Sequence, residues 1–124
     1  MNKPSKTFFE LDVWQRAHQL VLEVYSLTQN FPKSEVFGLT SQIRRASISI
    51  PANIAEGFKR MGKADKIRFY NISQASLEEV KYFIFLAKDL GYLNKDIQIN
   101  NLAEEISKML DKYIKHIHQS MKTS

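Results

Sequence analysis

Apolar residues recur at intervals of three and four positions along almost the whole chain. This spacing is typical of amphipathic helices that pack against one another, and alternating strand patterns are nearly absent. Within 124 residues there are only four glycines and three prolines, and most of them fall where helices should end. We therefore predict an all-α protein, an antiparallel up-down-up-down four-helix bundle. Residues 9–121 should form this single domain, after a disordered N-terminal arm of residues 1–8.

The predicted helices cover residues 12–30, 34–61, 63–90 and 94–118. Ser34 and Asn94 are the expected N-caps of the second and fourth helices, and Gly91 is the expected left-handed residue that ends the third. Pro51 lies in the middle of the second helix, where it removes one backbone hydrogen bond. We predict a kink at Pro51, because the apolar stripe keeps one face on both sides of it. A break into two short helices is the alternative.

Composition and motifs argue against catalysis. The chain has no cysteine, which excludes disulfides, a thiol nucleophile and cysteine-based metal sites. His116 and His118 are two positions apart and point to different helix faces, and no motif for nucleotide binding or hydrolysis is present. We expect no catalytic residues, no metal and no cofactor. No signal peptide and no apolar run of about 18 residues are visible, so we expect a cytoplasmic protein that does not enter membranes.

Positive charge is concentrated in short segments. The formal net charge is +5, and one cluster contains Lys59, Arg60, Lys63, Lys66 and Arg68 against the single acid Asp65. The tail carries Lys108, Lys112, Lys115 and Lys122 against Asp111. We predict that this cluster and the Arg44-Arg45 pair bind nucleic acid, since arginine and lysine both bind phosphate. Ordinary solvated lysine is the alternative. Phe58, Phe69 and Tyr70 lie among the cations and could stack on bases, but their apolar register favours a place in the core.

One stretch of the third helix is apolar on every side. Residues 82–87 read Tyr-Phe-Ile-Phe-Leu-Ala, and successive helix positions differ by about 100°. A bundle helix needs only one apolar stripe, so the surplus predicts an interface between copies of the chain at Tyr82, Phe83, Phe85 and Leu86. A locally broad core contact is the alternative.

Three segments resemble the four-helix bundle family also called the 23S rRNA intervening-sequence protein family. They are LDVWQRA at residues 11–17, FPKSEVFGLTSQIRRASISIPANIAEGFKR at 31–60 and SLEEVKYFIFLAKDLGYL at 76–93. The resemblance implies an antiparallel four-helix bundle that assembles into a homopentameric ring. It extends to the accessory variability determinant proteins of diversity-generating retroelements, which are basic pentamers that bind nucleic acid and a reverse transcriptase. The shared motif falls on Gln42, Arg44, Arg45, Ser49, Pro51, Asn53, Glu56 and Gly57.

The resemblance implies no catalytic role for these motif residues. The polar ones would line the ring interior or fix the kinked helix. Arg45 could also serve structurally, in a polar network with Gln42, Asn53 or Glu56.

Two functional hypotheses follow. The first is a non-catalytic, oligomeric accessory protein that binds RNA or DNA through its basic patches. The alternative is a scaffold ring that presents helices to a protein partner, such as a reverse transcriptase, and has no role with nucleic acid.

Overall fold

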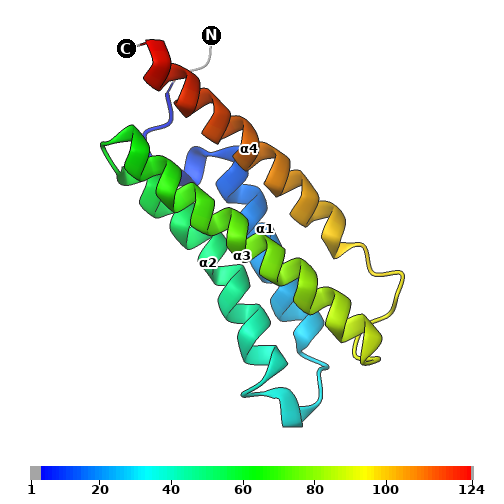
Figure 1. The fold of residues 1–124 in the computed structure, drawn as a ribbon. Helices are drawn as coiled ribbons and strands as arrows, with labels where there is room; N and C mark the ends of the chain where they lie inside the picture. Colours follow the sequence, from blue (N-terminus) through cyan, green and yellow to red (C-terminus); the bar gives the residue numbers. More distant parts are fainter. Residues whose placement is uncertain (1–3, 124) are drawn as a thin grey trace.

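The chain folds as four antiparallel helices. The computed structural model describes residues 4–123, and the helices are α1 (Asp12–Thr28), α2 (Leu39–Lys59), α3 (Lys63–Asp89) and α4 (Ile99–Thr123). Two 3₁₀ turns, η1 (Phe8–Glu10) and η2 (Lys33–Glu35), precede α1 and α2. Successive helices run in opposite directions (Figure 1), which confirms the all-α, four-helix prediction. No helix in the described range is both long enough and apolar enough to span a bilayer.

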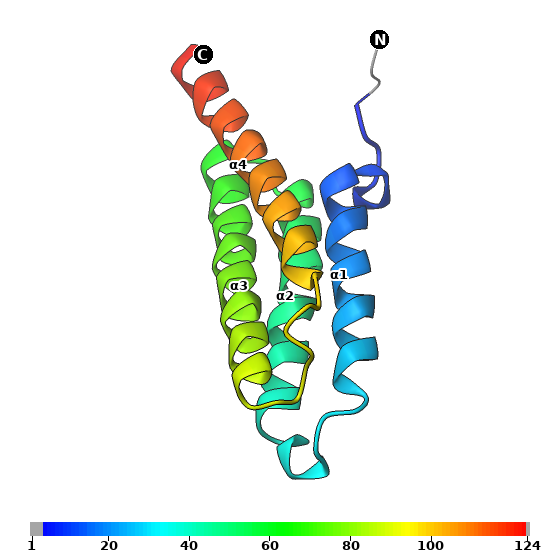
Figure 2. The ribbon, with the colours of Figure 1, turned by 90° about the vertical axis from the view of Figure 1, so that its right-hand side faces the viewer.

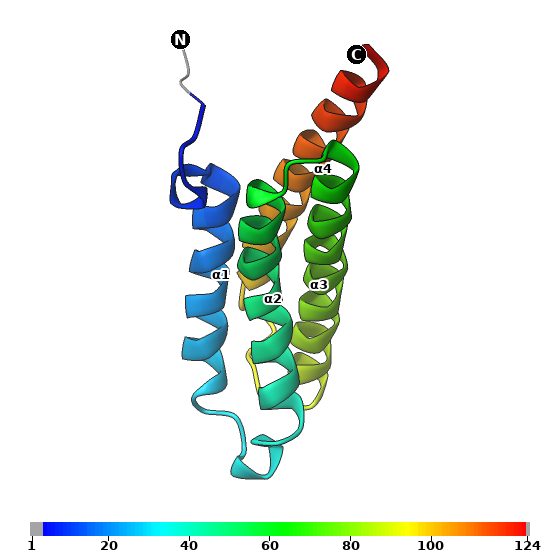
Figure 3. The ribbon, with the colours of Figure 1, turned by 90° about the vertical axis from the view of Figure 1, so that its left-hand side faces the viewer.

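The four helices are not equally close to one another. α2 and α3 lie side by side along their length, whereas α1 and α4 diverge toward the end that carries the start of α1 and the end of α4 (Figures 2 and 3). The core lies between the inward stripes of all four helices. Its largest fully buried apolar side chains are Leu20, Ile43, Ile50, Ile54, Leu77, Ile84, Ile106 and Leu110. Each such burial stabilises the fold by about 1.5–3 kcal/mol.

The packed part of the chain begins slightly earlier than predicted. Phe8 starts η1 and packs against the core, and its ring lies 5.0 Å from that of Trp14. Phe8, the last residue of the predicted arm, therefore belongs to the packed domain. Residues 1–3 of that arm lie outside the described residues.

The second helix starts later than predicted, at Leu39, and the side chain of Glu35 caps its first turn. Ser34 lies in η2 and makes no cap, so the prediction of an N-cap there is wrong. Glu35 accepts a hydrogen bond from the backbone N–H of Leu39 at 3.1 Å and satisfies one of the free donors at the start of α2. Its carboxylate occupies the space beside Gly38, where a Cβ would come within 2.5 Å of the Oε1 atom. A residue larger than glycine would displace this carboxylate.

The third helix ends as predicted, and the fourth does not begin as predicted. Gly91 has φ 78°, and the N–H groups of Gly91 and Tyr92 bond to the carbonyls of Lys88 and Ala87 at 3.1 and 2.9 Å. This pattern is a Schellman motif. Asn94 caps nothing, since α4 starts at Ile99.

The reason for the late start of α4 lies in the loop before it. The Lys88 ammonium donates to the carbonyl of Ile97 at 2.9 Å, and Ile97 packs against the core. These contacts hold the loop against α3 before the helix begins.

Pro51 lies inside a continuous helix. α2 runs unbroken from Leu39 to Lys59, so the alternative of two short helices is wrong, while the kink stays a prediction. Buried hydroxyls line the neighbouring turn. The Ser73 Oγ donates to the carbonyl of Ile50 at 2.8 Å, and the Ser76 Oγ donates to the Ser49 Oγ at 2.9 Å. These bonds join α3 to the backbone and the side chains of α2.

Gly57 allows α2 to approach α3 closely. A Cβ at position 57 would lie 2.7 Å from the Tyr70 Cε1 and 3.2 Å from the Phe69 Cβ. Tyr70 cannot easily give way, because it is only 5% exposed. Burial raises the pKa of Tyr70 to about 12, and the neighbouring phenol of Tyr113 adds to this rise.

We predict that Gly57→Ala destabilises the protein although alanine favours helices. The gain in helix propensity is about 1 kcal/mol, while overpacking a filled core costs about 1–3 kcal/mol. The contact of 2.7 Å places the cost in the upper half of that range, about 2–3 kcal/mol, so the net loss of unfolding free energy should be about 1–2 kcal/mol, measured by urea denaturation. Gly62→Ala is the control. A Cβ there meets only the Asp65 Cβ at 4.0 Å, and alanine at this N-cap of α3 should cost less than about 1 kcal/mol. Equal stability of the two variants would contradict the close approach of the helices.

Candidate nucleic-acid interface

Two basic segments that are remote in the sequence meet at one end of the bundle. The first is the turn between α2 and α3, and the second is the last part of α4 (Figure 2). The Nζ of Lys63 donates to the backbone carbonyl of Ser120 at 3.4 Å, which joins the two segments. Lys6 lies beside Lys59 and adds the N-terminal segment to the same end.

We call this end the basic end and define it by Lys6, Lys59, Arg60, Lys63, Lys66, Arg68, Lys115 and Lys122. Charges gathered in this way create a local positive field that attracts polyanions.

The lysines of the basic end that face solvent are available to a ligand. Lys59 and Lys63 are exposed, and so are Lys115 and Lys122 on α4. None of these four side chains forms an ion pair within residues 4–122. An ammonium group that has no acidic neighbour can contact a phosphate without first losing a partner.

The two arginines are oriented by acids and by an aromatic ring. Arg68 lies 2.9 Å from the Asp65 carboxylate, and Arg60 lies 3.6 Å from Asp65 and 3.4 Å from Glu56. Both guanidinium groups also lie over the ring of Phe69, Arg60 at 4.5 Å and Arg68 at 4.4 Å from its centre. Exposed ion pairs of this kind contribute about 0–1 kcal/mol, so a phosphate can displace the acids.

Lys66 has a structural position within the cluster. Its ammonium group donates to the carbonyls of Gly57 and Phe58 at 3.1 and 2.7 Å, both in the last turn of α2, where backbone acceptors lack a full set of helical partners. Burial lowers the pKa of Lys66. We conclude that Lys66 holds the turn between α2 and α3 and is the least available cation of the predicted set.

The aromatic residues of the predicted cluster belong mostly to the core. Phe69 and Tyr70 are 9% and 5% exposed, which confirms the core interpretation for these two. Phe58 is half-buried and packs against the core, with the Lys66 ammonium 5.7 Å from its ring centre. The α3 rings therefore offer no open face to a base.

Arg44 and Arg45 lie away from the basic end and differ from each other. Arg44 is half-buried, donates from Nε to the Thr28 Oγ1 at 2.8 Å and covers the ring of Tyr25 at 4.5 Å. This geometry joins α2 to α1. Arg45 is exposed, and the proposed network with Gln42, Asn53 or Glu56 does not form among the described residues.

The other members of that network are engaged elsewhere or exposed. The Asn53 Nδ2 donates to the backbone carbonyl of Ser49 at 2.8 Å and to the Ser49 Oγ at 2.9 Å. Glu56 pairs with Arg60, and Gln42 is exposed.

The predicted interface between copies divides into two kinds of residue. Tyr82 and Phe85 are 58% and 62% exposed, whereas Phe83 and Leu86 are half-buried against the chain's own core. Only Tyr82 and Phe85 therefore remain on the surface in the single chain.

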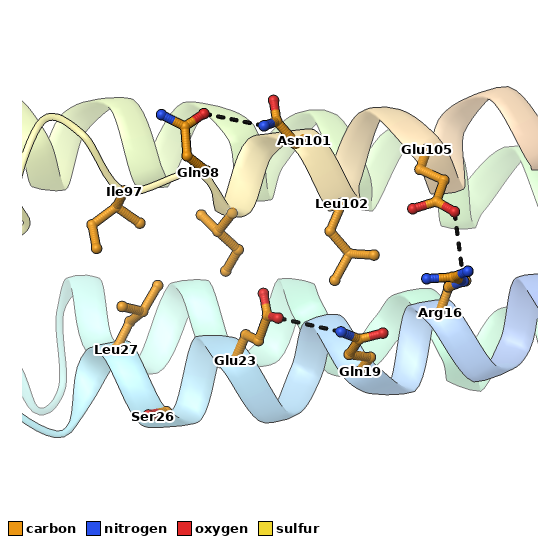
Figure 4. Close-up of a pocket in the computed structure, with 11 residues that line it drawn as sticks. Arg16, Gln19, Glu23, Ser26, Leu27, Ile97, Gln98, Asn101, Leu102 and Glu105 are labelled. Carbon is orange, nitrogen blue, oxygen red and sulfur yellow. Dashed lines mark hydrogen bonds and ion pairs between the residues drawn. The ribbon is translucent and has the colours of Figure 1, made fainter.

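A groove of about 580 Å³ lies between the later part of α1 and the start of α4 (Figure 4). Gln19 and Glu23 are hydrogen-bonded on α1, Gln98 and Asn101 lie opposite, and Leu27, Ile97 and Leu102 supply apolar contacts. Arg16 and Glu105 form an ion pair of 3.5 Å across it. No group of three or more histidine, aspartate or glutamate residues within the described chain could hold a metal. The groove carries mixed polarity and lies outside the basic end.

Sequence reasoning did not join the α4 tail to the turn between α2 and α3. The lengths of the two helices could have shown that these segments meet. α3 has 27 residues and α4 has 25, so an antiparallel pair returns the end of α4 to the start of α3. The contribution of residues 6–9 to the same end was also missed, because that segment has no helical period.

Comparisons with known proteins find a matching family and a similar solved structure. A family model described as 23S rRNA-intervening sequence protein matches residues 9–112. A crystal structure of a protein of unknown function from the S23 ribosomal protein family of Bacteroides thetaiotaomicron is similar, with a TM-score of 0.74 and 29% identity. That similarity covers 83% of this chain and 98% of the other. No curated protein matches.

We predict that Arg44 contributes to stability and Arg45 does not. Arg44→Ala removes a hydrogen bond to a charged group together with a cation–π contact, so unfolding free energy should fall by about 1–2 kcal/mol. Arg45→Ala should change it by less than about 0.5 kcal/mol, since Arg45 is exposed. Urea denaturation of both variants provides the measurement. If Arg44→Ala weakened nucleic-acid binding and left stability unchanged, the structural assignment would be wrong.

Proposed function

This chain belongs to the 23S rRNA-intervening sequence protein family, and we propose that it is a non-catalytic accessory protein that binds RNA or DNA through its basic end. The observation that carries the proposal is the meeting of three segments there. Lys63 contacts Ser120 of α4, and Lys6 of the N-terminal segment lines one groove together with Lys59. Phosphate contacts supply most of the affinity of proteins that bind nucleic acid without sequence preference. A set of exposed lysines around one end suits such contacts.

The different positions of the cations within the basic end support this proposal. Lys59, Lys63, Lys115 and Lys122 are exposed and would contact phosphates as point charges. Arg60 and Arg68 are pre-oriented by Asp65 and Phe69 and would add bidentate contacts. Lys66 would keep the turn in place beneath them.

We also propose that copies of the chain associate through the exposed face of α3, as the predicted homopentameric ring requires. Tyr82 and Phe85 lie within one turn of each other on that face and are more than half exposed. Large aromatic side chains are enriched at the centres of protein interfaces. The same two residues support the alternative function of a scaffold for a protein partner, and capture of that partner after nuclease treatment would favour it.

The nucleic-acid proposal predicts that Lys59→Glu with Lys63→Glu reduces affinity for RNA and DNA more than tenfold. Two phosphate contacts would become repulsive, and the slope of log affinity against log salt should become less steep by about 1.5–2. Fluorescence anisotropy with labelled RNA and DNA at several salt concentrations measures both quantities.

The matched control is Lys33→Glu with Lys95→Glu. These lysines are also exposed, lie in the loops at the opposite end and give the same change in net charge. Equal loss of affinity in both double variants would assign binding to net charge alone. Absence of wild-type binding at low salt would remove the proposed function.

The association proposal predicts that Tyr82→Glu with Phe85→Glu yields a monomer. Two buried carboxylates on an apolar interface would cost more than the interface gains. Size-exclusion chromatography with light scattering measures the mass of each protein. Met61→Glu is the control, because Met61 is 97% exposed in the turn between α2 and α3 and should leave the mass unchanged. A monomeric wild type at micromolar concentration would refute association through α3.

A further inference from the structure

The N-terminal segment and α2 enclose a groove of about 440 Å³ at the basic end. The residues that line it are Lys6, Thr7, Phe8, Phe9, Ala52, Ala55, Glu56, Phe58 and Lys59. Its volume lies within the range of sites that bind small molecules or single groups of a larger ligand. Aromatic and small apolar side chains dominate its lining, and lysines stand on both sides.

Phe9 is held in a fixed position although most of its ring is exposed. The residue is 57% exposed, yet its ring lies 4.1 Å from the ring of Phe8 and 5.2 Å from that of Trp14. The Gln15 Nε2 donates to the Phe9 carbonyl at 2.9 Å and fixes the backbone at this position. An aromatic face presented in this way loses little conformational entropy when a ligand stacks on it.

The opposite wall leaves room for a flat group. Ala52 and Ala55 are three positions apart on α2, so their small side chains share one face of the helix. Phe58 continues this wall toward the basic end, with the Lys66 ammonium 5.7 Å from its ring centre. Lys59 stands beside the groove and forms no ion pair in the described part of the chain.

We propose that this groove binds an unpaired base of single-stranded nucleic acid, with the base stacked on Phe9 and the adjoining phosphates on Lys6 and Lys59. The proposal rests on the proposed function and adds to it a preference for single strands. Aromatic rings beside cations are the common platform for unpaired bases. The bases of a duplex are stacked on one another and cannot enter such a groove.

The charge of the rim argues for this occupant over a second copy of the chain. Two copies that met symmetrically through this groove would bring Lys6 and Lys59 of each copy toward those of the other. Like charges placed together disfavour such an association. A polyanion with flat apolar bases matches both the positive rim and the aromatic wall.

The test compares Phe9→Leu and Phe9→Tyr in the full chain. Leucine keeps an apolar side chain without a π-face, whereas tyrosine keeps the ring. Affinity for oligo(dT) and oligo(U) should fall about 5- to 150-fold in Phe9→Leu, the factor that corresponds to 1–3 kcal/mol for one stacked base. Phe9→Tyr should retain the wild-type affinity within about threefold. Affinity for duplex DNA and RNA should not change in either variant.

Two further measurements separate stacking from folding. Trp14 is the only tryptophan and contacts Phe9, so oligo(dT) should quench its fluorescence in the wild type and in Phe9→Tyr but not in Phe9→Leu. Phe37→Leu is the matched control, since Phe37 is 93% exposed in the loop at the opposite end of the bundle. It should leave affinity for all of these nucleic acids unchanged.

The outcomes distinguish this inference from the proposed function. If the wild type bound neither single strands nor duplexes, the proposed function would fail. If it bound both and Phe9→Leu changed neither affinity, the basic end would stand as a phosphate-binding site and the stacking site would be refuted. An equal loss for single strands and duplexes in Phe9→Leu would assign Phe9 to packing alone.

Discussion

The close approach of α2 to α3 is the contact on which the rest of the molecule depends. Gly57 lets the Tyr70 ring lie against the α2 backbone, and the buried hydroxyl of Ser73 bonds to the carbonyl of Ile50. These contacts need small or hydroxyl-bearing residues on both helices, because larger side chains would separate them. The Lys66 ammonium then closes the end of α2. The helix pair therefore fixes the position of the turn that carries most of the basic end.

The basic end gains its charge from the path of the chain as much as from local composition. Arg60 and Arg68 share Asp65, so this turn alone offers less positive charge than its sequence suggests. Lysines from the end of α4 and from the N-terminal segment restore the excess. Because α4 tilts away from α1 toward this end (Figure 3), its outer face reaches solvent beside the turn. The groove between α1 and α4 lies toward the other end of the bundle and has no such charge excess.

Helix number, helix type and the core could be predicted from the sequence, because a period of three and four reports directly on one buried stripe. The starts of α2 and α4 could not. Glu35 caps α2 from outside the helix, and the contact of Lys88 with Ile97 holds the loop before α4. Neither contact leaves a periodic signal in the sequence. Arg44 shows the same limit for the candidate site. Its charge suggested nucleic acid, whereas its partner Thr28 lies 16 positions away in the sequence. Long-range partners of this kind decide whether an exposed-looking cation belongs to a site or to the fold.

The proposed association through α3 and the proposed binding at the basic end would use different parts of the same helix. Tyr82 and Phe85 lie in its C-terminal half, whereas Lys63 and Arg68 lie in its first turns. Copies joined through Tyr82 and Phe85 around one axis would therefore hold all their basic ends on the same rim. A single basic end offers only a few unpaired lysines, and salt weakens each phosphate contact. A rim of several such ends converts later contacts with one strand into intramolecular ones, which raises affinity without any new contact within the subunit. In the proposed assembly, modest charge on one chain would then be enough for tight binding.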